Sequence, residues 1–461
     1  MSSFYIAATH KSSGKTTISI GLAAAFSKQG YAVQTFKKGP DYIDPIWLAQ
    51  ASGKDCHNLD FFSASAEFNV QQFQHFSRHN EIILVEGNMG LFDGLSLDGC
   101  DSNAAMAKLL KLPVVLVVDC SGTSRGIAPL LLGYQMFDPE LSYAGVILNK
   151  VAGTRHETKL RQVIEAHTDF KVLGVVHRNK EIQLTERHLG LMPSHEMTEQ
   201  ADTVIGKLAD LMTRSIDLEG LKALSDSSLL TPTVTMASPL KQDSAQLRIA
   251  YARDEAFGFY YPNDLERFRQ LGVELVDFDT SHSKCLPDDI DGLFIGGGFP
   301  EARLQSISAN RSLCQDIKSK IEQGLPGYAE CGGLMYLCSS MMLEGRSYPL
   351  CDLIPAQVVM NQRPQGRGYV IMQPTSNHPW CRDTTQQKAA VRAHEFHYSS
   401  LNNLPQNLKY AYTIDRGTGI DGINDGIVLY NLLASYVHLR QTDHCSWVDD
   451  FVSFVAKCKS S

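Results

Sequence analysis

The strongest chemical signal in this chain is a cysteine between small residues. Cys331 follows the apolar run that begins at Leu325 and precedes Gly332 and Gly333. Glycines beside a cysteine are typical of a strand-to-helix turn that presents a nucleophile, because they permit close backbone approach and positive φ. The amides of a following helix favour a thiolate. We therefore expect a reactive cysteine, against the alternative of a buried structural thiol at a glycine turn.

Acyl transfer at a cysteine also needs an oxyanion hole and a base. Residues 291–301 predict a buried strand that enters a Gly-Gly-Gly loop. The amides of such a loop stabilise an oxyanion when they lie beside the nucleophile. We expect the hole at Gly297, Gly298 and Gly332. Candidate bases are the histidine that follows the apolar run 434–437 and two histidines at strand-like spacing, namely His438, His394 and His397.

The N-terminal segment predicts phosphate binding. Residues 3–8 read as a buried strand and 18–26 as a helix, and Gly-Lys-Thr-Thr lies in the loop between them. Loop amides and the helix N-terminus hold phosphates, the lysine reaches the terminal phosphates, and the hydroxyl meets Mg²⁺. Thr9 stands where the usual motif has its first glycine. The residues expected to contact ATP are Ser13, Gly14, Lys15, Thr16, Thr17 and, from strand 141–150, Asn149.

Acidic residues after two predicted strands indicate a magnesium site. Mg²⁺ prefers oxygen ligands. Glu86 ends the apolar strand 82–86, at the sheet edge where open α/β folds bind ligands, and Asp44 follows an earlier strand. With Thr16 they form the expected metal set, and Asp119 is a rival carboxylate. Lys37 and Lys38 lie beside the phosphate loop, where they suit an anionic substrate.

Composition limits the class of protein. The 461 residues allow two or three domains. A net charge of -8 argues against general nucleic-acid binding, and no apolar run approaches the roughly 20 residues that span a bilayer. The start of the sequence does not resemble a signal peptide. The eleven cysteines contain no Cys-x-x-Cys, which argues against a disulfide framework and favours the reducing cytoplasm.

The predicted organisation has two α/β domains. Residues 1–224 form the first domain, with a last strand expected near 184–193. Residues 225–245 are rich in Ser, Thr, Pro and Lys without a sustained period, and we interpret them as a linker. The second domain spans 246–461.

Several segments together resemble the cobyrinic acid a,c-diamide synthases, amidotransferases of cobalamin biosynthesis, and their hydrogenobyrinate-using counterparts. The resemblance covers nearly the whole length. It includes the Gly-Pro-Asp-Tyr-Ile-Asp-Pro motif at 39–45 and the Val-Glu-Gly-Asn-Met-Gly-Leu-Phe-Asp-Gly motif at 85–94. Further matches lie at 186–191 and 254–261, in the glycine loop, at the cysteine turn, and at 394–399.

The resemblance implies an N-terminal ATP-dependent P-loop domain, similar to dethiobiotin synthetase, and a C-terminal class I glutamine amidotransferase domain with a flavodoxin-like fold. It selects His438 as the base for Cys331. Most class I glutaminases carry a glutamate two residues after this histidine, but here the residue is Arg440, so the group that orients the histidine is left open. The implied substrate-side residues are Lys37, Lys38, Asp41, Tyr42 and Asp60.

The resemblance also implies the reaction. ATP with Mg²⁺ activates the a and c carboxylates of a corrinoid as acyl phosphates, and ammonia from L-glutamine displaces phosphate. Alternatives are another tetrapyrrole a,c-diamide synthase, a cobyrate amidotransferase, a silent regulator with the same fold, and a partition-type ATPase. We expect small-molecule substrates and no nucleic-acid or membrane partner. A homodimer is compatible with the sequence.

Overall fold

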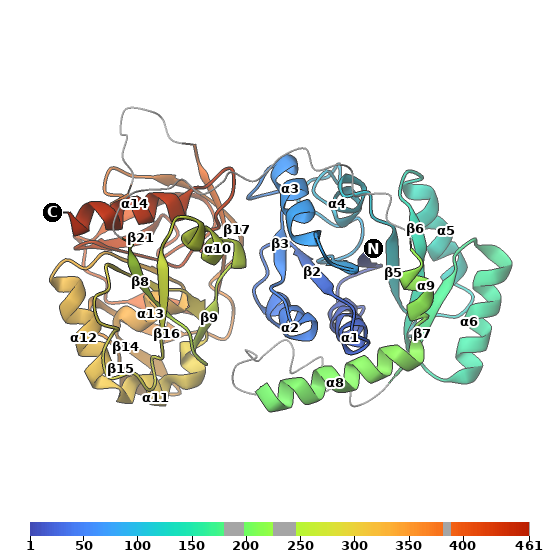
Figure 1. The fold of residues 1–461 in the computed structure, drawn as a ribbon, viewed down its shortest axis with the longest axis horizontal. Coiled ribbons are helices and arrows are strands. Elements are labelled where there is room, and N and C mark those ends of the chain that lie inside the picture. Colours follow the sequence, from blue (N-terminus) through green and yellow to red (C-terminus); the bar gives the residue numbers. More distant parts are fainter. Residues whose placement is uncertain (179–197, 225–245, 381–388, 461) are drawn as a thin grey trace. The chain divides into compact units, whose positions relative to one another are not determined.

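The computed structural model in Figure 1 describes residues 1–178, 198–224, 246–380 and 389–460. The chain divides into two compact units, residues 1–61 with 65–236 and residues 62–64 with 237–461. The predicted linker 225–245 and the predicted strand near 184–193 lie outside the described residues. Within the described ranges, no helix combines the length and apolarity needed to cross a membrane.

The first unit is built on a seven-stranded parallel sheet of order β3-β2-β4-β1-β5-β6-β7 (Figure 1). The strands are β1 (Ser2–Ala8), β2 (Val33–Lys38), β3 (His57–Leu59), β4 (Ile82–Glu86), β5 (Val114–Asp119), β6 (Tyr143–Val151) and β7 (Val172–His177). Their near-continuous apolar runs suit a parallel sheet that is covered on both faces. Because β1 lies between β4 and β5, the loop after β1 emerges beside the ends of both neighbours.

Helices cover both faces of this sheet. They are α1 (Lys15–Lys28), α2 (Ile43–Ser52), α3 (Ala66–Ser77), α4 (Asn103–Leu109), α5 (Ile127–Phe137), α6 (Thr154–His167), α8 (Thr198–Ser215) and α9 (Leu218–Lys222). Phe4 and Ile6 belong to the core under α1, α2 and α8, whereas Tyr5 and Ala7 belong to the core under α3 to α6. This alternation follows from the two-residue period of a strand. The helix predicted over 18–26 begins three residues earlier, at Lys15.

The second unit contains a nine-stranded mixed sheet of order β10-β8-β11-β13-β22-β21-β20-β17-β18. Its strands are β8 (Arg248–Ala252), β10 (Glu274–Phe278), β11 (Gly292–Ile295), β13 (Gly327–Glu330), β17 (Gly366–Pro374), β18 (Val391–His397), β20 (Lys409–Arg416), β21 (Asn424–Leu429) and β22 (Leu432–Ser435). The five strands from β10 to β22 pair in parallel, and the rest of the sheet is antiparallel.

Two small sheets complete the strands of this unit. The first pairs β9 (Phe257–Phe259) with β12 (Gly297–Gly298). The second has the order β15-β14-β16-β19, formed by β14 (Cys338–Leu343), β15 (Arg346–Pro349), β16 (Ile354–Met360) and β19 (Ser399–Asn402). The helical segments are α10 (Pro262–Gln270), η2 (Pro300–Arg303), α11 (Leu304–Ala309), α12 (Arg311–Glu322), α13 (Gly332–Leu337) and α14 (Trp447–Lys459).

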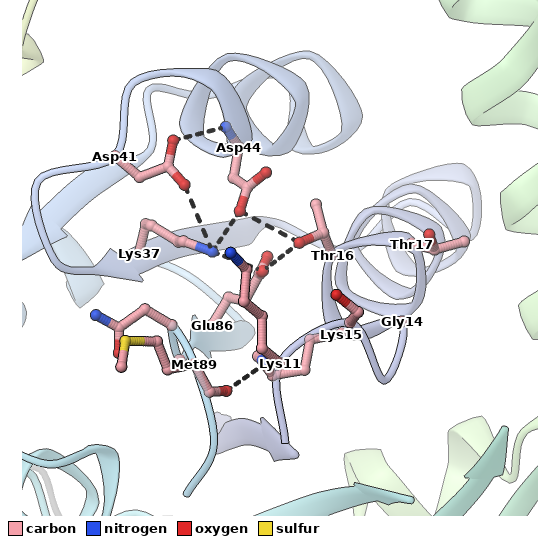
Figure 2. A pocket seen from close by; sticks show the side chains of 13 residues that line it. Lys11, Gly14, Lys15, Thr16, Thr17, Lys37, Asp41, Asp44, Glu86 and Met89 are labelled. Atoms are coloured by element: carbon pink, nitrogen blue, oxygen red, sulfur yellow. Dashed lines mark hydrogen bonds and ion pairs between the residues drawn. The ribbon is translucent and has the colours of Figure 1, made fainter. Parts of the chain in front are cut away.

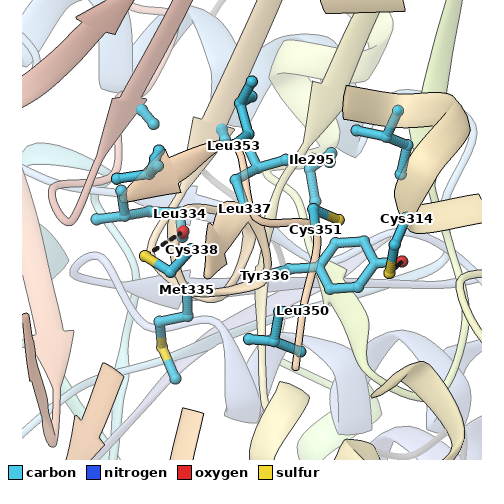
Figure 3. Close-up of a cluster of buried hydrophobic side chains, with 14 of the residues drawn as sticks. Ile295, Cys314, Leu334, Met335, Tyr336, Leu337, Cys338, Leu350, Cys351 and Leu353 are labelled. Carbon is cyan, nitrogen blue, oxygen red and sulfur yellow. Dashed lines mark hydrogen bonds between the residues drawn. The ribbon is translucent and has the colours of Figure 1, made fainter. Parts of the chain in front are cut away.

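The short helix α13 is held in place by the core of the second unit (Figure 3). Leu334 and Leu337 are fully buried and belong to the same cluster as Ile295 of β11. Cys338 Sγ donates to the carbonyl of Leu334 at 3.4 Å. Close packing on every side fixes where α13 begins. The turn between β13 and α13, which contains the predicted nucleophile, is therefore set by the core.

Candidate functional site

The predicted phosphate loop turns between β1 and α1 through left-handed backbone. Ser12 has a φ of 66° and Gly14 a φ of 91°. The Ser13 hydroxyl donates to the carbonyl of His10 at 2.8 Å. Gly14 occupies the N-cap of α1, so α1 starts at Lys15 with its first amides directed into the loop. This arrangement is suited to anion binding at a helix N-terminus.

A cavity of about 530 Å³ opens at this loop. Its lining includes the predicted residues Gly14, Lys15, Thr16 and Thr17. The Lys15 ammonium donates to the carbonyl of Met89 at 2.5 Å. Burial lowers the pKa of Lys15 to about 8, so a phosphate partner would favour its charged form.

The three predicted metal ligands converge in the same cavity, together with Lys37 (Figure 2). The Thr16 hydroxyl is 2.7 Å from Glu86 Oε1 and 3.2 Å from Asp44 Oδ2. The Lys37 ammonium lies 2.7 Å from the same Glu86 oxygen and 2.5 Å from the same Asp44 oxygen. Burial disfavours the charge of Lys37, but the carboxylates of Asp44 and Glu86 outweigh it and raise the pKa of Lys37.

The donor set fits Mg²⁺ bound together with a nucleotide. Mg²⁺ is usually held by one or two carboxylates plus phosphate oxygens and water. Glu86 is fully buried, and its Oε2 has no hydrogen-bond partner among the described residues. A buried carboxylate oxygen left in this way is a ligand position for a hard cation. The described residues contain no cluster of three or more His, Cys, Asp or Glu side chains that could hold a metal by themselves.

Of the other predicted substrate-side residues, Asp41 lines this cavity, and the remaining three lie nearby in the chain at the ends of β2 and β3. Asp41 lines it and accepts from the backbone of Ile43 at 2.9 Å, and burial, followed by the nearby Asp44 carboxylate, raises the pKa of Asp41 to about 7. Tyr42 is the N-cap of α2. Lys38 is 4% exposed, so it is not a solvated lysine, and its ammonium lies 3.5 Å from Asn88 Oδ1. Asp60 is buried beyond the end of β3 and contributes to the field at Lys38.

Asn149 of β6, predicted to contact the nucleotide, and Asp119 of β5, the rival candidate for the metal, are register partners on these adjacent strands. The Asn149 amide donates to the carbonyl of Ser13 at 2.8 Å, which ties β6 to the phosphate loop. A role in reading the base stays a prediction. Asp119, the rival metal carboxylate, lies 2.9 Å from the Lys150 ammonium and accepts from the Ser121 amide. Glu86 and Asp44 lie with Thr16, whereas Asp119 has an ion-pair partner of its own.

In the second unit, Cys331 occupies the turn between β13 and α13. Its φ is 48° and its ψ is -100°, a conformation that L-residues rarely adopt. The Cys331 amide donates to the carbonyl of Ser435 at 2.7 Å, and its carbonyl accepts from Met335 at 3.0 Å. The side chain is 6% exposed. Such a turn directs a side chain away from both the strand and the helix.

His438 lies three residues beyond the end of β22 and faces Cys331. Strands β13 and β22 pair in parallel with Glu330 opposite Ser435, which brings the two chain segments together. A hydrogen bond joins the side chains of His438 and Cys331. Nδ1 of His438 lies 3.4 Å from Oε2 of Glu330.

The three predicted oxyanion glycines lie around this pair. A Cβ added at Gly297 would lie 2.5 Å from Cε1 of His438. A Cβ added at Gly332 would lie 3.0 Å from the backbone nitrogen of Gly298. Larger residues at these positions would therefore collide with the pair or with the loop, and the glycines allow the backbone to approach.

Two buried carboxylates near this pair were not predicted from the sequence. Glu330 immediately precedes Cys331, the predicted nucleophile. Asp425, in β21, accepts from the Ser435 hydroxyl at 2.5 Å and from the amides of Tyr436 and Val437 at 3.1 and 3.0 Å. Asp425 thus fixes the segment that leads to His438. Each is an acidic residue at or near the end of a strand that also contains apolar residues, and that was the sequence signal available for both.

His394 and His397, the other two candidate bases, lie on β18. His394 forms a backbone bridge with His438, whose amide donates to the His394 carbonyl at 2.8 Å. His397 Nδ1 lies 2.8 Å from the carbonyl of Ser399. Arg440 is 3% exposed, and its guanidinium lies 5.5 Å from the ring centre of Tyr261.

Two models of known families match successive parts of the chain. The CobQ/CobB/MinD/ParA nucleotide binding domain matches residues 4–191, and the CobB/CobQ-like glutamine amidotransferase domain matches residues 248–444. The predicted α/β fold, with a P-loop domain followed by a glutamine amidotransferase domain, is confirmed.

Relatives match over almost the entire chain. A cobyrinate a,c-diamide synthase of Magnetococcus marinus is 41% identical over 459 residues, which cover 98% of this chain and 96% of that protein. Proteins of the same name from Caldanaerobacter subterraneus subsp. tengcongensis and Synechocystis sp. are each 37% identical, over 99% and 97% of this chain and 98% and 92% of those proteins. With both candidate sites in one chain, these matches show that the protein belongs to the cobyrinate a,c-diamide synthase family.

Proposed function

We propose that this chain is a glutamine-hydrolysing ligase that converts the a and c carboxylates of cobyrinate to amides in cobalamin biosynthesis, using ATP and L-glutamine. The observation that carries the proposal is the presence of both half-sites in one chain. The loop at Lys15 and Thr16 suits phosphoryl transfer, and the Cys331 and His438 pair suits amide hydrolysis. A partition-type ATPase would have no use for the second site.

The glutaminase half-reaction uses the second unit. Cys331 Sγ attacks the side-chain carboxamide carbon of glutamine, and the amides near Gly297, Gly298 and Gly332 hold the oxyanion. His438 gives a proton to the nitrogen as the C–N bond breaks, and ammonia leaves. Water then cleaves the thioester, which releases glutamate and restores Cys331.

The ligase half-reaction uses the first unit. A substrate carboxylate attacks the γ-phosphorus of ATP to give an acyl phosphate and ADP, and ammonia then displaces phosphate to give the amide. Lys15 holds the terminal phosphates, and Ser13, Gly14, Thr17 and Asn149 complete the proposed ATP site. Mg²⁺, held by Thr16, Asp44 and Glu86, supplies charge neutralisation at the phosphates when it is bound. The substrate-side residues proposed are Lys37, Lys38, Asp41, Tyr42 and Asp60.

Mass spectrometry of the products tests the proposal. The protein is incubated with ATP, Mg²⁺, glutamine and each of cobyrinate, hydrogenobyrinate and other carboxylated tetrapyrroles. Two successive replacements of hydroxyl by amine on cobyrinate are expected. No amidation of any tetrapyrrole, in protein that releases glutamate from glutamine, would contradict the assignment. Amidation of hydrogenobyrinate alone would move the substrate to the cobalt-free corrinoid.

The proposal extends to assembly and location. Helix α5 exposes Leu130, Leu132, Met136 and Phe137, the last two at 76% and 75%. Such a face suits a homodimer. Light scattering after size exclusion would detect a dimer, and Met136→Lys should weaken it.

The proposed location is the cytoplasm, where free cysteines are kept reduced. A consistent observation is that all ten cysteines in the described part of the chain are free.

A further inference from the structure

Glu330, the last residue of β13, lies directly behind the imidazole of His438. Its Oε2 is 3.4 Å from Nδ1 of His438, and the Glu330 side chain is 4% exposed. Because Glu330 precedes Cys331, one strand end supplies both the nucleophile and this carboxylate. The pairing of Glu330 with Ser435 between β13 and β22 brings His438 to the same strand end.

The other carboxylate oxygen of Glu330 is held by the scaffold. Oε1 accepts from the Tyr328 hydroxyl at 2.6 Å and from the Leu439 amide at 2.8 Å. Leu439 follows His438, so the carboxylate is bonded to the backbone that carries the imidazole. These two bonds fix the direction of Oε2 toward Nδ1, which is the way a second group usually sets the orientation and tautomer of a working histidine.

The charges around His438 favour its protonated form. Burial opposes the charge, but the nearby side chains of Cys331 and Glu330 outweigh burial and raise the pKa of His438 to about 10. On the other packed elements, His394 bridges to His438 through the backbone, and Asp264 lies near enough to both Glu330 and Arg440 to feel their charges. Among the described residues, the carboxylate found within ion-pair distance of His438 is Glu330.

We propose that Glu330 is the positioning residue that holds His438, through Nδ1, in the orientation and protonation state in which Nε2 gives its proton to departing ammonia. This role rests on the proposed glutaminase half-reaction. Glu330 remains a carboxylate throughout, and the proton that moves is the one on Nε2. Arg440, at the position where most class I glutaminases carry a glutamate, has the opposite charge and cannot take this role.

The decisive variant is Glu330→Gln, because glutamine keeps an oxygen for Tyr328 and Leu439 but loses the charge that faces Nδ1. Glutamate release from glutamine is followed from pH 6 to 10.5, and amide synthesis from ammonium is measured in parallel. We expect kcat for glutamine to fall about 100-fold with little change in KM, which is at the low end of what a positioned proton donor contributes. The alkaline limb of the pH profile of kcat/KM, where activity falls as His438 loses its proton, should move to lower pH. Synthesis from ammonium should stay within about twofold of the wild type, since the ligase step does not use His438.

Glu330→Asp and Glu395→Gln separate positioning from general stability. The aspartate keeps the charge and should restore most of the alkaline limb. Glu395 is another buried carboxylate of this unit, which accepts from the amides of Thr418 and Gly419 and lies 3.7 Å from His397, so its glutamine variant should leave the limb unmoved.

An unmoved alkaline limb in Glu330→Gln, or a limb that Glu330→Asp does not restore, would overturn the positioning role. If Glu330→Gln does not fold, the position of the limb in Glu330→Asp decides alone: a limb near that of the wild type supports the role, and a limb shifted to lower pH overturns it. Wild-type protein that releases no glutamate would instead overturn the proposed function.

Discussion

The Lys37 ammonium lies 2.7 Å from Glu86 Oε1, the same oxygen to which the Thr16 hydroxyl donates. Lys37 and Glu86 are register partners on the adjacent parallel strands β2 and β4. Both side chains are buried, at 3% and 0% exposure. The lysine therefore balances the charge of the carboxylates that are proposed to hold Mg²⁺.

Lys37→Met should destabilise the first unit in EDTA, because removal of one partner of a buried ion pair costs about 3–5 kcal/mol. It should also tighten Mn²⁺ binding in the absence of nucleotide, since the carboxylates would have lost the competing cation. Thermal melts in EDTA and titration with Mn²⁺ measure the two effects. Lys38→Met, which changes the neighbouring lysine of β2, is the control and should not tighten Mn²⁺. Equal Mn²⁺ affinity in wild type and Lys37→Met would contradict the competition.

Lys15→Ala should lower amide synthesis at least about 1000-fold with either glutamine or ammonium, because carboxylate activation precedes the use of nitrogen. Glutamate release measured without ATP should persist. Near-normal synthesis from ammonium would remove Lys15 from phosphoryl transfer.

Glu86→Ala and Asp119→Ala compare the two candidate metal carboxylates. Loss of Glu86 should raise the Mg²⁺ concentration needed for half-maximal synthesis by about tenfold or more, as expected for loss of a direct ligand. Asp119→Ala should change it little, because Asp119 pairs with Lys150. A Mg²⁺ titration of synthesis from ammonium measures both, and the reverse order of effects would assign the metal to Asp119.

Cys331→Ala should abolish synthesis from glutamine and spare synthesis from high ammonium. The reason is that the nucleophile is lost while the ATP site is untouched. His438→Ala should behave similarly but less severely, and His394→Ala should not reproduce the selective loss. Amide synthesis with each nitrogen source is the measurement. Parallel loss with both sources in folded Cys331→Ala would mean that the thiol is structural.

His438 should make stability depend on pH in a defined direction. Its pKa is about 10 in the folded chain and about 6.5 when unfolded, so the folded state binds the proton more tightly. The contribution of this proton to the free energy of unfolding is fully present below pH 6.5 and is lost as pH rises toward 10. The difference in melting temperature between wild type and His438→Gln should shrink from pH 6 to pH 10. A constant difference would contradict the raised pKa.

The sequence predicted the α/β fold, and it marked two local motifs whose chemistry stays a prediction. The phosphate loop and the cysteine turn are visible because each is one continuous segment with glycine at fixed positions. Glu330 could not be assigned, because its direction toward His438 depends on the register between β13 and β22. The contact of Lys37 with Glu86 likewise depends on β2 lying beside β4, an order that the sequence does not state.

The left-handed backbone at Cys331 sets a limit on how the chain can be made more heat-resistant. Glycine would relieve a strain of about 1–3 kcal/mol at this position, and it would also remove the thiol. Selection for thermal resistance alone would therefore drift toward an inactive chain. Directed evolution of this scaffold has to select on glutamine-dependent turnover throughout, and gains in robustness must come from positions away from the turn.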